Sequence, residues 1–356
     1  MIRFTFFRIL LYLPAKLYEC FVRLRLLLYE RGYIKPCKLK AKVISVGNIT
    51  VGGTGKTPIV EYLARSLSRN GCKVAVLTRG YKRKNTRCST LIVSSSSWVE
   101  EAGDEPMMLA RKLDGVSVIV DSDRCRSGLL AIEQLASEVL LLDDGFQHLR
   151  LERDLDILVL DATDLFGGGK MIPFGRLREP LSGMRRADVI IVTRSHKGVD
   201  ELLLLDTLAA LNMNDRPIFR ASYRFVRLAD CVTDRVVELE RLNGRKVAAL
   251  CAIARPDVFF EDLCSYGAKV VLKAAFPDHY FYRQADVDSV FMSAIAAGAD
   301  CVVTTQKDQT KLRGLVLGKL PVYVVELELT FDEELRFREL ISSYVDGFWN
   351  LSYSKA

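Results

Sequence analysis

Through most of the chain, short runs of apolar and largely β-branched residues alternate with longer amphipathic segments. Such alternation is typical of a parallel β-sheet in which helices connect successive strands. We predict strands at residues 43–46, 74–77, 116–120, 139–142, 157–160, 189–192, 247–252, 270–272, 301–305 and 322–325. We predict helices at residues 58–69, 105–113, 124–135, 257–265 and 286–297. The pattern therefore predicts an α/β fold.

The alternation is interrupted over residues 218–236, where charged residues separate strand-like pieces. We interpret this stretch as an interdomain connection. It divides the chain into a larger domain at residues 36–217 and a smaller α/β domain at residues 237–350.

Residues 1–35 are rich in Leu, Phe and Tyr but are interrupted by charges, and the longest uncharged run is only residues 9–15. A membrane span needs about 20 apolar residues, so we predict no span here. On a helical wheel the charged residues Arg8, Lys16, Glu19 and Arg23 lie within about 80° of one another, which predicts an amphipathic helix. Pro14 is expected to break it into two pieces. An uninterrupted apolar middle is missing, which disfavours a signal peptide.

Two interpretations of this amphipathic helix remain open. It can lie on an anionic membrane surface, where each basic residue contributes about 1 kcal/mol. It can also pack on the protein's own core, because amphipathicity does not show what the apolar face touches.

Composition and charge narrow the class of protein. The chain has 356 residues, 49% hydrophobic and 27% charged, which is typical of a folded globular protein. Its net charge is +7, but residues 1–42 alone carry ten Lys or Arg against two Glu, a net +8. The rest is nearly neutral, so we expect no nucleic-acid partner. The nine cysteines form no C-x-x-C pair, which favours a reducing compartment over a disulfide framework or a zinc site.

The strongest chemical signal is the segment Val-Gly-Asn-Ile-Thr-Val-Gly-Gly-Thr-Gly-Lys-Thr-Pro at residues 46–58, between a predicted strand and a predicted helix. Glycines let backbone N–H groups converge on phosphate oxygens at the positive end of the helix dipole. Lys56 is expected to reach the β- and γ-phosphates, and the Thr57 hydroxyl to bind Mg²⁺. Thr50 replaces the first glycine of the usual pattern, and a glycine-rich turn without a ligand is the alternative. The predicted nucleotide-binding residues are Thr50, Val51, Gly52, Gly53, Thr54, Gly55, Lys56 and Thr57.

Acidic residues supply the second signal. Asp143 and Asp144 follow a buried strand, at the position where α/β sheets place Mg²⁺-binding carboxylates, although such a pair can also cap a helix. Asp104, after Gly103, resembles a helix N-cap. His279 lies in a loop after a predicted strand, and on its own a loop histidine is more often incidental than catalytic.

Seven motifs in order resemble the tetraacyldisaccharide 4'-kinase family over nearly the whole length. They are the segment at residues 45–58, Thr-Arg-Gly-Tyr at 78–81, Gly-Asp-Glu-Pro at 103–106, Asp-Asp-Gly-Phe-Gln-His at 143–148, Pro-Phe-Gly-Arg-Leu-Arg-Glu-Pro at 173–180, Phe-Pro-Asp-His at 276–279 and Thr-Thr-Gln-Lys-Asp at 304–308. The resemblance implies a P-loop NTPase-like parallel sheet domain, a smaller α/β domain and the N-terminal amphipathic helix. It implies transfer of the γ-phosphate of ATP, with Mg²⁺, to the 4'-hydroxyl of an acylated glucosamine disaccharide 1-phosphate, giving lipid IVA in lipid A biosynthesis.

The resemblance also implies roles and a location. Lys56, Asp104 and His279 are the implied catalytic residues, with Asp104 and His279 as a base and its orienting partner. Thr57, Asp143 and Asp144 are implied near Mg²⁺. Arg124, Arg178 and Glu179 are candidate substrate residues. The lipid A precursor implies a peripheral or monotopic enzyme on the cytoplasmic face of the inner membrane, without an obligate protein partner.

The sequence departs from the family at two places. Gln306 stands where an acidic residue is typical, and residues 166–173 are a variant of a usually Asn/Gly-rich loop. These departures bear on fine nucleotide or substrate contacts rather than on the reaction class.

Two other functions are disfavoured. A membrane-associated nucleotide switch with guanine specificity needs N-K-x-D, and Gln-Lys-Asp at 306–308 does not match, although residues 164–167 match D-x-x-G. A non-enzymatic scaffold does not explain a phosphate loop together with paired acids and a candidate base.

Overall fold

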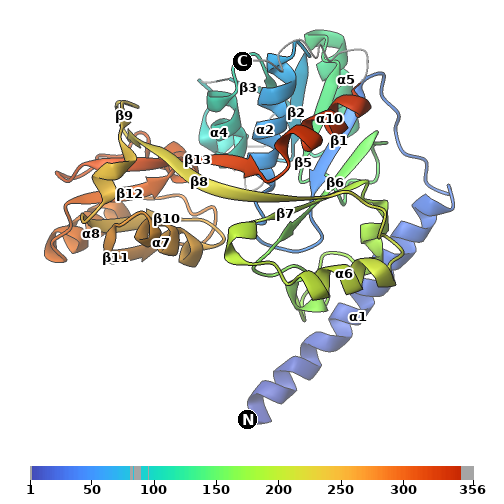
Figure 1. Cartoon of the computed structure of the whole chain (residues 1–356), viewed down its shortest axis with the longest axis horizontal. Helices are drawn as coiled ribbons and strands as arrows, with labels where there is room; N and C mark the ends of the chain where they lie inside the picture. The colour runs from blue at the N-terminus through green and yellow to red at the C-terminus, as the bar shows by residue number, and fades with distance from the viewer. Residues whose placement is uncertain (1, 81–82, 84–89, 95, 346–356) are drawn as a thin grey trace.

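The computed structural model describes residues 2–80, 83, 90–94 and 96–345. In these residues a mixed 13-stranded sheet runs in the order β11-β10-β12-β13-β8-β7-β6-β1-β5-β2-β4-β3, with β9 paired to β8 (Figure 1). The strands are β1 (Lys42–Gly47), β2 (Val74–Thr78), β3 (Leu91–Val93), β4 (Ser117–Val120), β5 (Val139–Asp143), β6 (Leu155–Asp161), β7 (Val189–Thr193), β8 (Ile218–Asp230), β9 (Val236–Val237), β10 (Lys246–Cys251), β11 (Lys269–Ala275), β12 (Cys301–Thr305) and β13 (Val322–Phe331).

Helices connect most of these strands. The α-helices are α1 (Ile2–Glu30), α2 (Lys56–Arg69), α3 (Val99–Ala102), α4 (Asp104–Lys112), α5 (Arg124–Leu135), α6 (Glu201–Ala210), α7 (Pro256–Ser265), α8 (Gln284–Ala296), α9 (Gln306–Leu312) and α10 (Glu334–Tyr344). The 3₁₀ turns are Gly167–Gly169, Leu181–Arg186, Ser195–Lys197 and Leu239–Leu242. All ten predicted strands and all five predicted helices are confirmed, and their ends agree within three residues except that β13 continues beyond 325 to Phe331.

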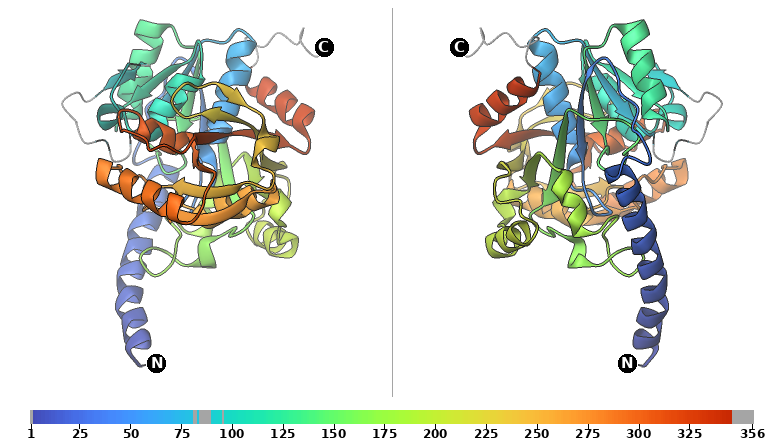
Figure 2. Two further views of the ribbon diagram at one scale, coloured as in Figure 1. Left: turned by 90° about the vertical axis from the view of Figure 1, so that its left-hand side faces the viewer. Right: turned by 90° about the vertical axis from the view of Figure 1, so that its right-hand side faces the viewer.

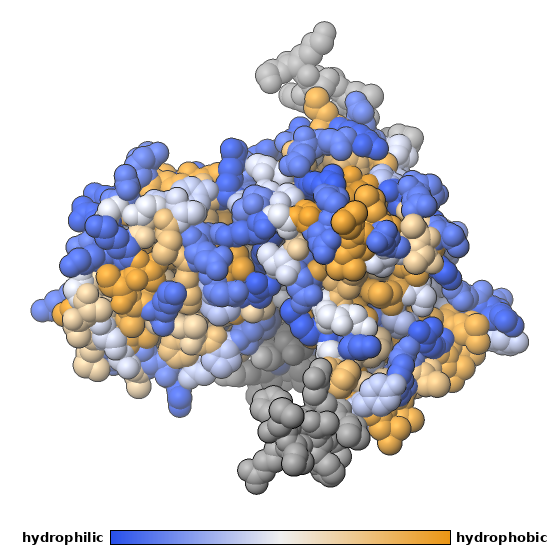
Figure 3. Space-filling view, turned by 60° about the horizontal axis from the view of Figure 1, so that its bottom comes forward, coloured by the Kyte–Doolittle hydropathy of each residue, from blue (hydrophilic) through white to orange (hydrophobic). Residues whose placement is uncertain are grey.

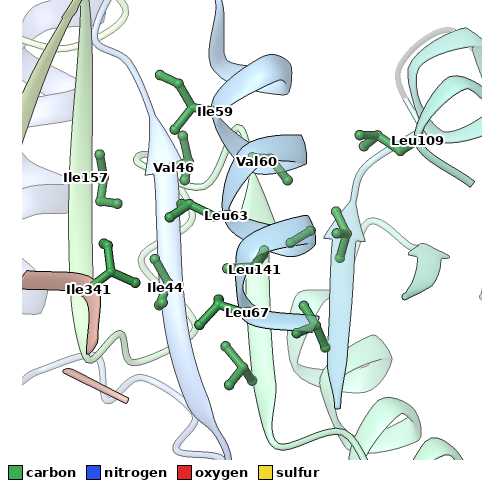
Figure 4. Close-up of a cluster of buried hydrophobic side chains, with 14 of the residues drawn as sticks. Ile44, Val46, Ile59, Val60, Leu63, Leu67, Leu109, Leu141, Ile157 and Ile341 are labelled. Carbon is green, nitrogen blue, oxygen red and sulfur yellow. The ribbon is translucent and has the colours of Figure 1, made fainter. Parts of the chain in front are cut away.

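Alternation along each strand sends side chains to opposite faces of the sheet. Ile44 and Val46 of β1 pack with α2 on one face, whereas Val43 packs with the cluster beneath α5 on the other. Figure 4 shows Ile59, Leu63 and Leu67 of α2 beside the side chains of β1. Both faces are covered, which explains why these strands are apolar at nearly every position.

Three strand pairs are antiparallel and correct the expectation of a purely parallel sheet. β3 pairs antiparallel with β4 at one end, and β8 pairs antiparallel with β13 in the middle and with the short strand β9. β8 is one 13-residue strand over most of the predicted connection at 218–236, with alternating rather than continuous burial. Charged residues on its exposed positions, such as Arg224 and Arg227, pair with Glu328 and Glu326 of β13, which is why the sequence pattern looked irregular.

Figure 1 shows β8 and β13 running between the elements around β1 and those around β10. Leu250, Val302 and Val324 lie in a hydrophobic cluster of their own with α8. α10, which falls in the predicted range 237–350, packs Phe337 and Ile341 into the cluster that holds α2. The predicted domain boundaries stay predictions.

α1 is continuous from Ile2 to Glu30 with Pro14 inside it, so the predicted break at Pro14 is wrong. Proline removes one backbone hydrogen bond and costs about 3 kcal/mol, but it can kink a helix without ending it. In Figures 1 and 2 the N-terminal end of α1 extends away from the rest of the molecule. Across the described residues, we find no helix with both the length and the apolarity of a membrane span.

Candidate active site

Loops at the carboxyl ends of the parallel strands open into one cavity of about 970 Å³. One wall is formed by the loop after β1 and by residues that follow β5. The facing wall is formed by the loops after β10, β11 and β12, including His279 and Lys307. Ligands of open α/β sheets bind at the carboxyl ends of strands, so this cavity is the candidate active site.

Residues 48–55 form the phosphate loop, which leaves β1 and leads into α2. Gly55 is the N-cap of α2 with φ of 82°, and a Cβ placed there would lie 1.8 Å from the Tyr223 hydroxyl. Only glycine therefore fits at this position. Asn48 Nδ2 donates to Thr54 Oγ1 at 3.0 Å inside the loop, so the buried asparagine fixes the loop from below.

Neighbouring side chains hold the carbonyls of the phosphate loop. Tyr223 donates to the Gly55 carbonyl at 2.9 Å, Thr193 to the Thr54 carbonyl at 2.8 Å and Arg194 to the Gly53 carbonyl at 3.1 Å. These hydrogen bonds hold the carbonyl side of the loop. The loop therefore keeps the conformation in which its backbone N–H groups can converge on an anion. The N–H of Val51 donates to the Arg176 carbonyl instead.

Asp143 and Asp144 lie beside the phosphate loop, and their pKa values are shifted in opposite directions. Asp143 ends β5 and is buried, and burial together with Glu105 and Asp144 raises its pKa to about 7. Burial alone would also raise the pKa of Asp144, but Lys56 and Arg178 outweigh it and lower the pKa to about 2. Lys56 Nζ is 3.4 Å from Asp144 Oδ1, and Arg178 Nη1 is 2.8 Å from Oδ2.

The alternative that Asp143 and Asp144 cap a helix is wrong, because the residues directly after them form turns. Asp144 itself has a positive φ of 54°, and Gly145 follows it. The backbone thus reverses sharply at the end of β5 and leaves one carboxylate at the strand end and one at the cavity wall.

The raised pKa of Asp143 predicts a pH-dependent stability without divalent cations. Its folded pKa of about 7 exceeds the ordinary 3.8, so the folded state binds the proton more tightly than the unfolded state. Stability therefore falls as pH rises from about 4 to about 7. We expect Asp143→Asn to raise the free energy of unfolding above about pH 7, because the buried carboxylate is then no longer ionised in the folded state.

Urea unfolding in chelator-containing buffer across this pH range measures the effect. Asp144→Asn is the matched control with the opposite sign. Its lowered folded pKa contributes stability above the unfolded value, so this variant should lose stability at neutral pH. A loss of stability in Asp143→Asn above pH 7 would contradict the argument.

Asp104 and His279 meet across the cavity although 175 residues separate them in sequence. His279 Nδ1 is 3.0 Å from both carboxylate oxygens of Asp104. Asp104 is 4% exposed, and burial by itself would raise its pKa. The hydrogen bond from His279 and the charge of Lys307 outweigh burial and lower the pKa to about 2. Asp104 is therefore an ionised carboxylate at neutral pH.

Helix capping does not account for Asp104. Gly103, with φ of 96°, is the N-cap of α4, and Asp104 is its first residue. Asp104 Oδ1 accepts a hydrogen bond from the N–H of Glu105, but its side chain points to His279. His279 has a positive φ of 64°, a conformation that a non-glycine residue adopts rarely and often at functional sites.

The three candidate substrate residues all line the cavity but differ in their partners. Arg178 pairs with Asp144 at the cavity wall. Arg124 is buried, and burial lowers its pKa to about 10. It donates to the carbonyl of Asp121 at 2.6 Å. Glu179 is 1% exposed and accepts from Gln147 at 2.7 Å and from Arg186 at 2.8 Å.

Several residues of the site were missed from the sequence. Tyr223, Thr193 and Arg194 support the phosphate loop from β8 and from the end of β7, and nothing in their local sequence marks them. Lys307 lies in a motif singled out above, yet the motif gave it no role. Gln147 donates to the Asn48 carbonyl at 2.6 Å and so joins the paired acids to the phosphate loop.

Comparisons with known proteins extend over nearly the whole chain. A family model described as Tetraacyldisaccharide-1-P 4'-kinase matches residues 7–346. The chain is 42% identical to a tetraacyldisaccharide 4'-kinase of Geobacter sulfurreducens over 89% of this chain and 88% of the relative. It is 37% identical to one from Halothermothrix orenii over 92% and 90%. A crystal structure of LpxK from Aquifex aeolicus in complex with ATP is similar with a TM-score of 0.76 and 36% identity, covering 97% of this chain and 100% of that chain.

Proposed function

This chain belongs to the tetraacyldisaccharide 4'-kinase family, and from that premise we propose how its residues divide the work of the reaction. It is an ATP-dependent kinase that phosphorylates the 4'-position of an acylated disaccharide in lipid A biosynthesis. The match to the family over residues 7–346 carries this assignment. The residue roles below are our proposal.

ATP binds with its phosphates on the phosphate loop and the start of α2. The site residues are Thr50, Val51, Gly52, Gly53, Thr54, Gly55, Lys56 and Thr57, with Lys56 on the β- and γ-phosphates. Of these, Val51 contributes through packing, because its N–H already donates to Arg176. The ATP complex of the Aquifex aeolicus relative supports nucleotide binding by this fold.

The donor set beside the phosphate loop fits Mg²⁺. Mg²⁺ prefers oxygen ligands and is usually held by one or two carboxylates together with substrate phosphates. Thr57, Asp143 and Asp144 supply a hydroxyl and two carboxylates. Among the described residues no group of three or more His, Cys, Asp or Glu is placed to hold a metal ion. The raised pKa of Asp143 supports this fit, since a cation would neutralise the crowded carboxylates.

The acceptor side consists of Asp104 and His279. Phosphoryl transfer needs mainly positioning and charge neutralisation, with one group that receives the hydroxyl proton. An Asp104 carboxylate with a pKa of about 2 is too weak a base for that task near neutral pH. Asp104 therefore orients the ring through Nδ1–H, and Nε2 of His279 accepts the proton of the 4'-hydroxyl. Arg178, Arg124 and Glu179 shape the end of the cavity that receives the sugar, with Arg178 as the direct contact.

The acylated substrate requires an enzyme at a membrane surface, and α1 has the side chains for that position. Its inner face packs on the protein through Ala15, Tyr18 and Val22. The opposite face exposes a stripe of apolar side chains, namely Leu13, Leu17, Phe21 and Leu24. Figure 3 turns the bottom of Figure 1 forward, and apolar side chains gather at its lower right. The two sequence interpretations of α1 are thus compatible, because one face packs and the other is free for lipid.

Replacing Leu17 and Phe21 by Glu tests this membrane contact. These side chains are 65% and 67% exposed, so their replacement should leave the fold intact. Burying a large apolar side chain contributes about 1.5–3 kcal/mol, so we expect the double variant to bind anionic vesicles at least about tenfold more weakly.

Cosedimentation with vesicles measures the binding of the double variant. Leu335→Glu on α10 is the control, since Leu335 is 73% exposed but lies on a helix far from α1 in Figure 1. Unchanged vesicle binding by the double variant would remove the membrane role of α1.

The activity itself is tested with labelled ATP, Mg²⁺ and an acylated disaccharide 1-phosphate presented in detergent micelles. We expect label in a bisphosphorylated lipid. Hydrolysis of ATP without any labelled lipid would contradict the proposed division of roles.

A further inference from the structure

Lys307 contacts Nε2 of the proposed base, and its Nζ also lies 3.9 Å from Asp104 Oδ2. Its Nζ is 3.3 Å from His279 Nε2, 3.0 Å from Glu105 Oε1 and 3.1 Å from Asp278 Oδ1. An ammonium has three N–H donors and no acceptor. All three donors of Lys307 therefore have a partner, and the one toward Nε2 needs a lone pair on that nitrogen.

Lys307 is protonated and positively charged at neutral pH. Burial alone would lower its pKa, but Glu105, Asp104 and Asp278 outweigh burial and raise the pKa above its ordinary value. The side chain is 15% exposed and reaches the cavity from the first turn of α9. It is therefore a fixed cation beside the ring.

The two neighbours of the imidazole fix its protons. Asp104, an ionised carboxylate, accepts a hydrogen bond and so requires a proton on Nδ1. Lys307 only donates and so requires Nε2 to be unprotonated. The ring is then neutral, with its lone pair on the nitrogen that a general base uses.

Without Lys307 the surroundings favour a second proton on the ring. Two carboxylates lie against His279: Asp104 of α4, and Asp278 of its own loop, whose Oδ2 is 3.6 Å from Nε2. Glu105 of α4 lies beside the Lys307 ammonium. Among the described residues, a second lysine of α9, Lys311, is 3.9 Å from Asp104 but pairs with Asp308 at 2.7 Å. Carboxylates beside the ring stabilise an imidazolium, and an imidazolium accepts no proton.

We propose that Lys307 is a positioning residue that keeps Nε2 of His279 unprotonated, so that the ring meets the acceptor hydroxyl as a base. The acceptor hydroxyl replaces the ammonium at Nε2, while Glu105 and Asp278 keep Lys307 close by. During transfer the hydroxyl proton moves to Nε2 as the new O–P bond forms and the bond from the γ-phosphorus to ADP breaks. This inference rests on the proposed role of His279.

Nitrogen NMR of ¹⁵N-histidine-labelled protein tests the proposal directly. The chain has three histidines, so His279 can be assigned by substituting His148 and His196 in turn. Near neutral pH we expect the wild type to show Nδ1 protonated and Nε2 unprotonated. In Lys307→Met we expect both nitrogens protonated and kcat lowered about tenfold or more, with the KM for ATP little changed. Lys307→Arg, which keeps a donor and the charge, should keep Nε2 unprotonated.

Two further variants separate the specific effect from a general loss of charge. Lys197→Met removes a lysine that also lies between two carboxylates, Asp262 and Glu261, beside a different histidine. It should leave the His279 signals unchanged. Lys307→Met combined with Asp278→Asn removes one charge of each sign and should restore the neutral ring.

An unprotonated Nε2 in Lys307→Met overturns the proposal. If that variant does not fold, the wild type decides, because a protonated Nε2 there overturns it equally. Failure of the proposed function gives a different result. The His279→Ala variant would then retain full kcat, while the His279 signals of the protein that keeps this residue would still change when Lys307 is substituted.

Discussion

Replacing Lys56 by alanine is expected to lower the rate of lipid phosphorylation by about 10³-fold or more. Lys56 is the first residue of α2, and its side chain is 11% exposed. Its Nζ is 3.4 Å from Asp144 Oδ1, directly after the phosphate loop. Charge on the transferred phosphoryl group is spread over its oxygens, so a fixed cation in a site shielded from water stabilises it strongly. Alanine leaves that charge without its main partner.

The loss should be confined to the reaction. Arg178 still pairs with Asp144 at 2.8 Å in the Lys56→Ala variant, so Asp144 is not left without a counter-charge. The midpoint of thermal unfolding should therefore change little. Lys42→Ala is the matched control, because Lys42 Nζ is 3.3 Å from Asp154 Oδ1, a similar ion pair on the surface.

The rate is measured with labelled ATP and the acylated disaccharide 1-phosphate, and the fold by circular dichroism. Turnover by folded Lys56→Ala near the wild-type rate would remove Lys56 from the proposed mechanism.

The sequence predicted the strands well because burial on both faces of a sheet leaves a strong local signal. Runs such as residues 139–142 and 189–192 are apolar throughout, and both form central strands. β8 was interpreted as a connection because its partner β13 lies about 100 residues away, and Arg224 is suited to a strand only once Glu328 is opposite. Pairing of that kind is a tertiary property and leaves no mark in a local window.

The residues of the candidate site also differ in how far the local sequence predicted them. The phosphate loop was found because glycine, lysine and threonine have fixed offsets in one short segment. Asp104 and His279 were found only through the resemblance to a family, since neither local segment indicates that they meet. Lys307 was left without a role because its effect depends on three partners from other parts of the chain, Glu105 of α4 and Asp278 and His279 of the loop after β11.

Loss of either member of the Asp104–His279 pair is the second large effect that we expect. His279→Ala removes the nitrogen that accepts the hydroxyl proton, and kcat should fall by about 10²-fold or more. Asp104→Ala should lower kcat by a similar factor, because without the carboxylate the His279 ring loses the partner that holds a proton on Nδ1. The KM for ATP should change little in both variants, because neither side chain belongs to the phosphate loop.

The double variant distinguishes a cooperating pair from two independent contributions. Residues that act as a unit are strongly non-additive, so Asp104→Ala with His279→Ala should be about as slow as the slower single variant. Asp104→Asn sharpens the test, because it keeps the shape of the side chain but can present N–H to Nδ1 and so favour the wrong tautomer. We therefore expect Asp104→Asn to be no faster than Asp104→Ala. Multiplicative losses in the double variant, or a rapid Asp104→Asn enzyme, would mean that Asp104 does not act through the ring of His279.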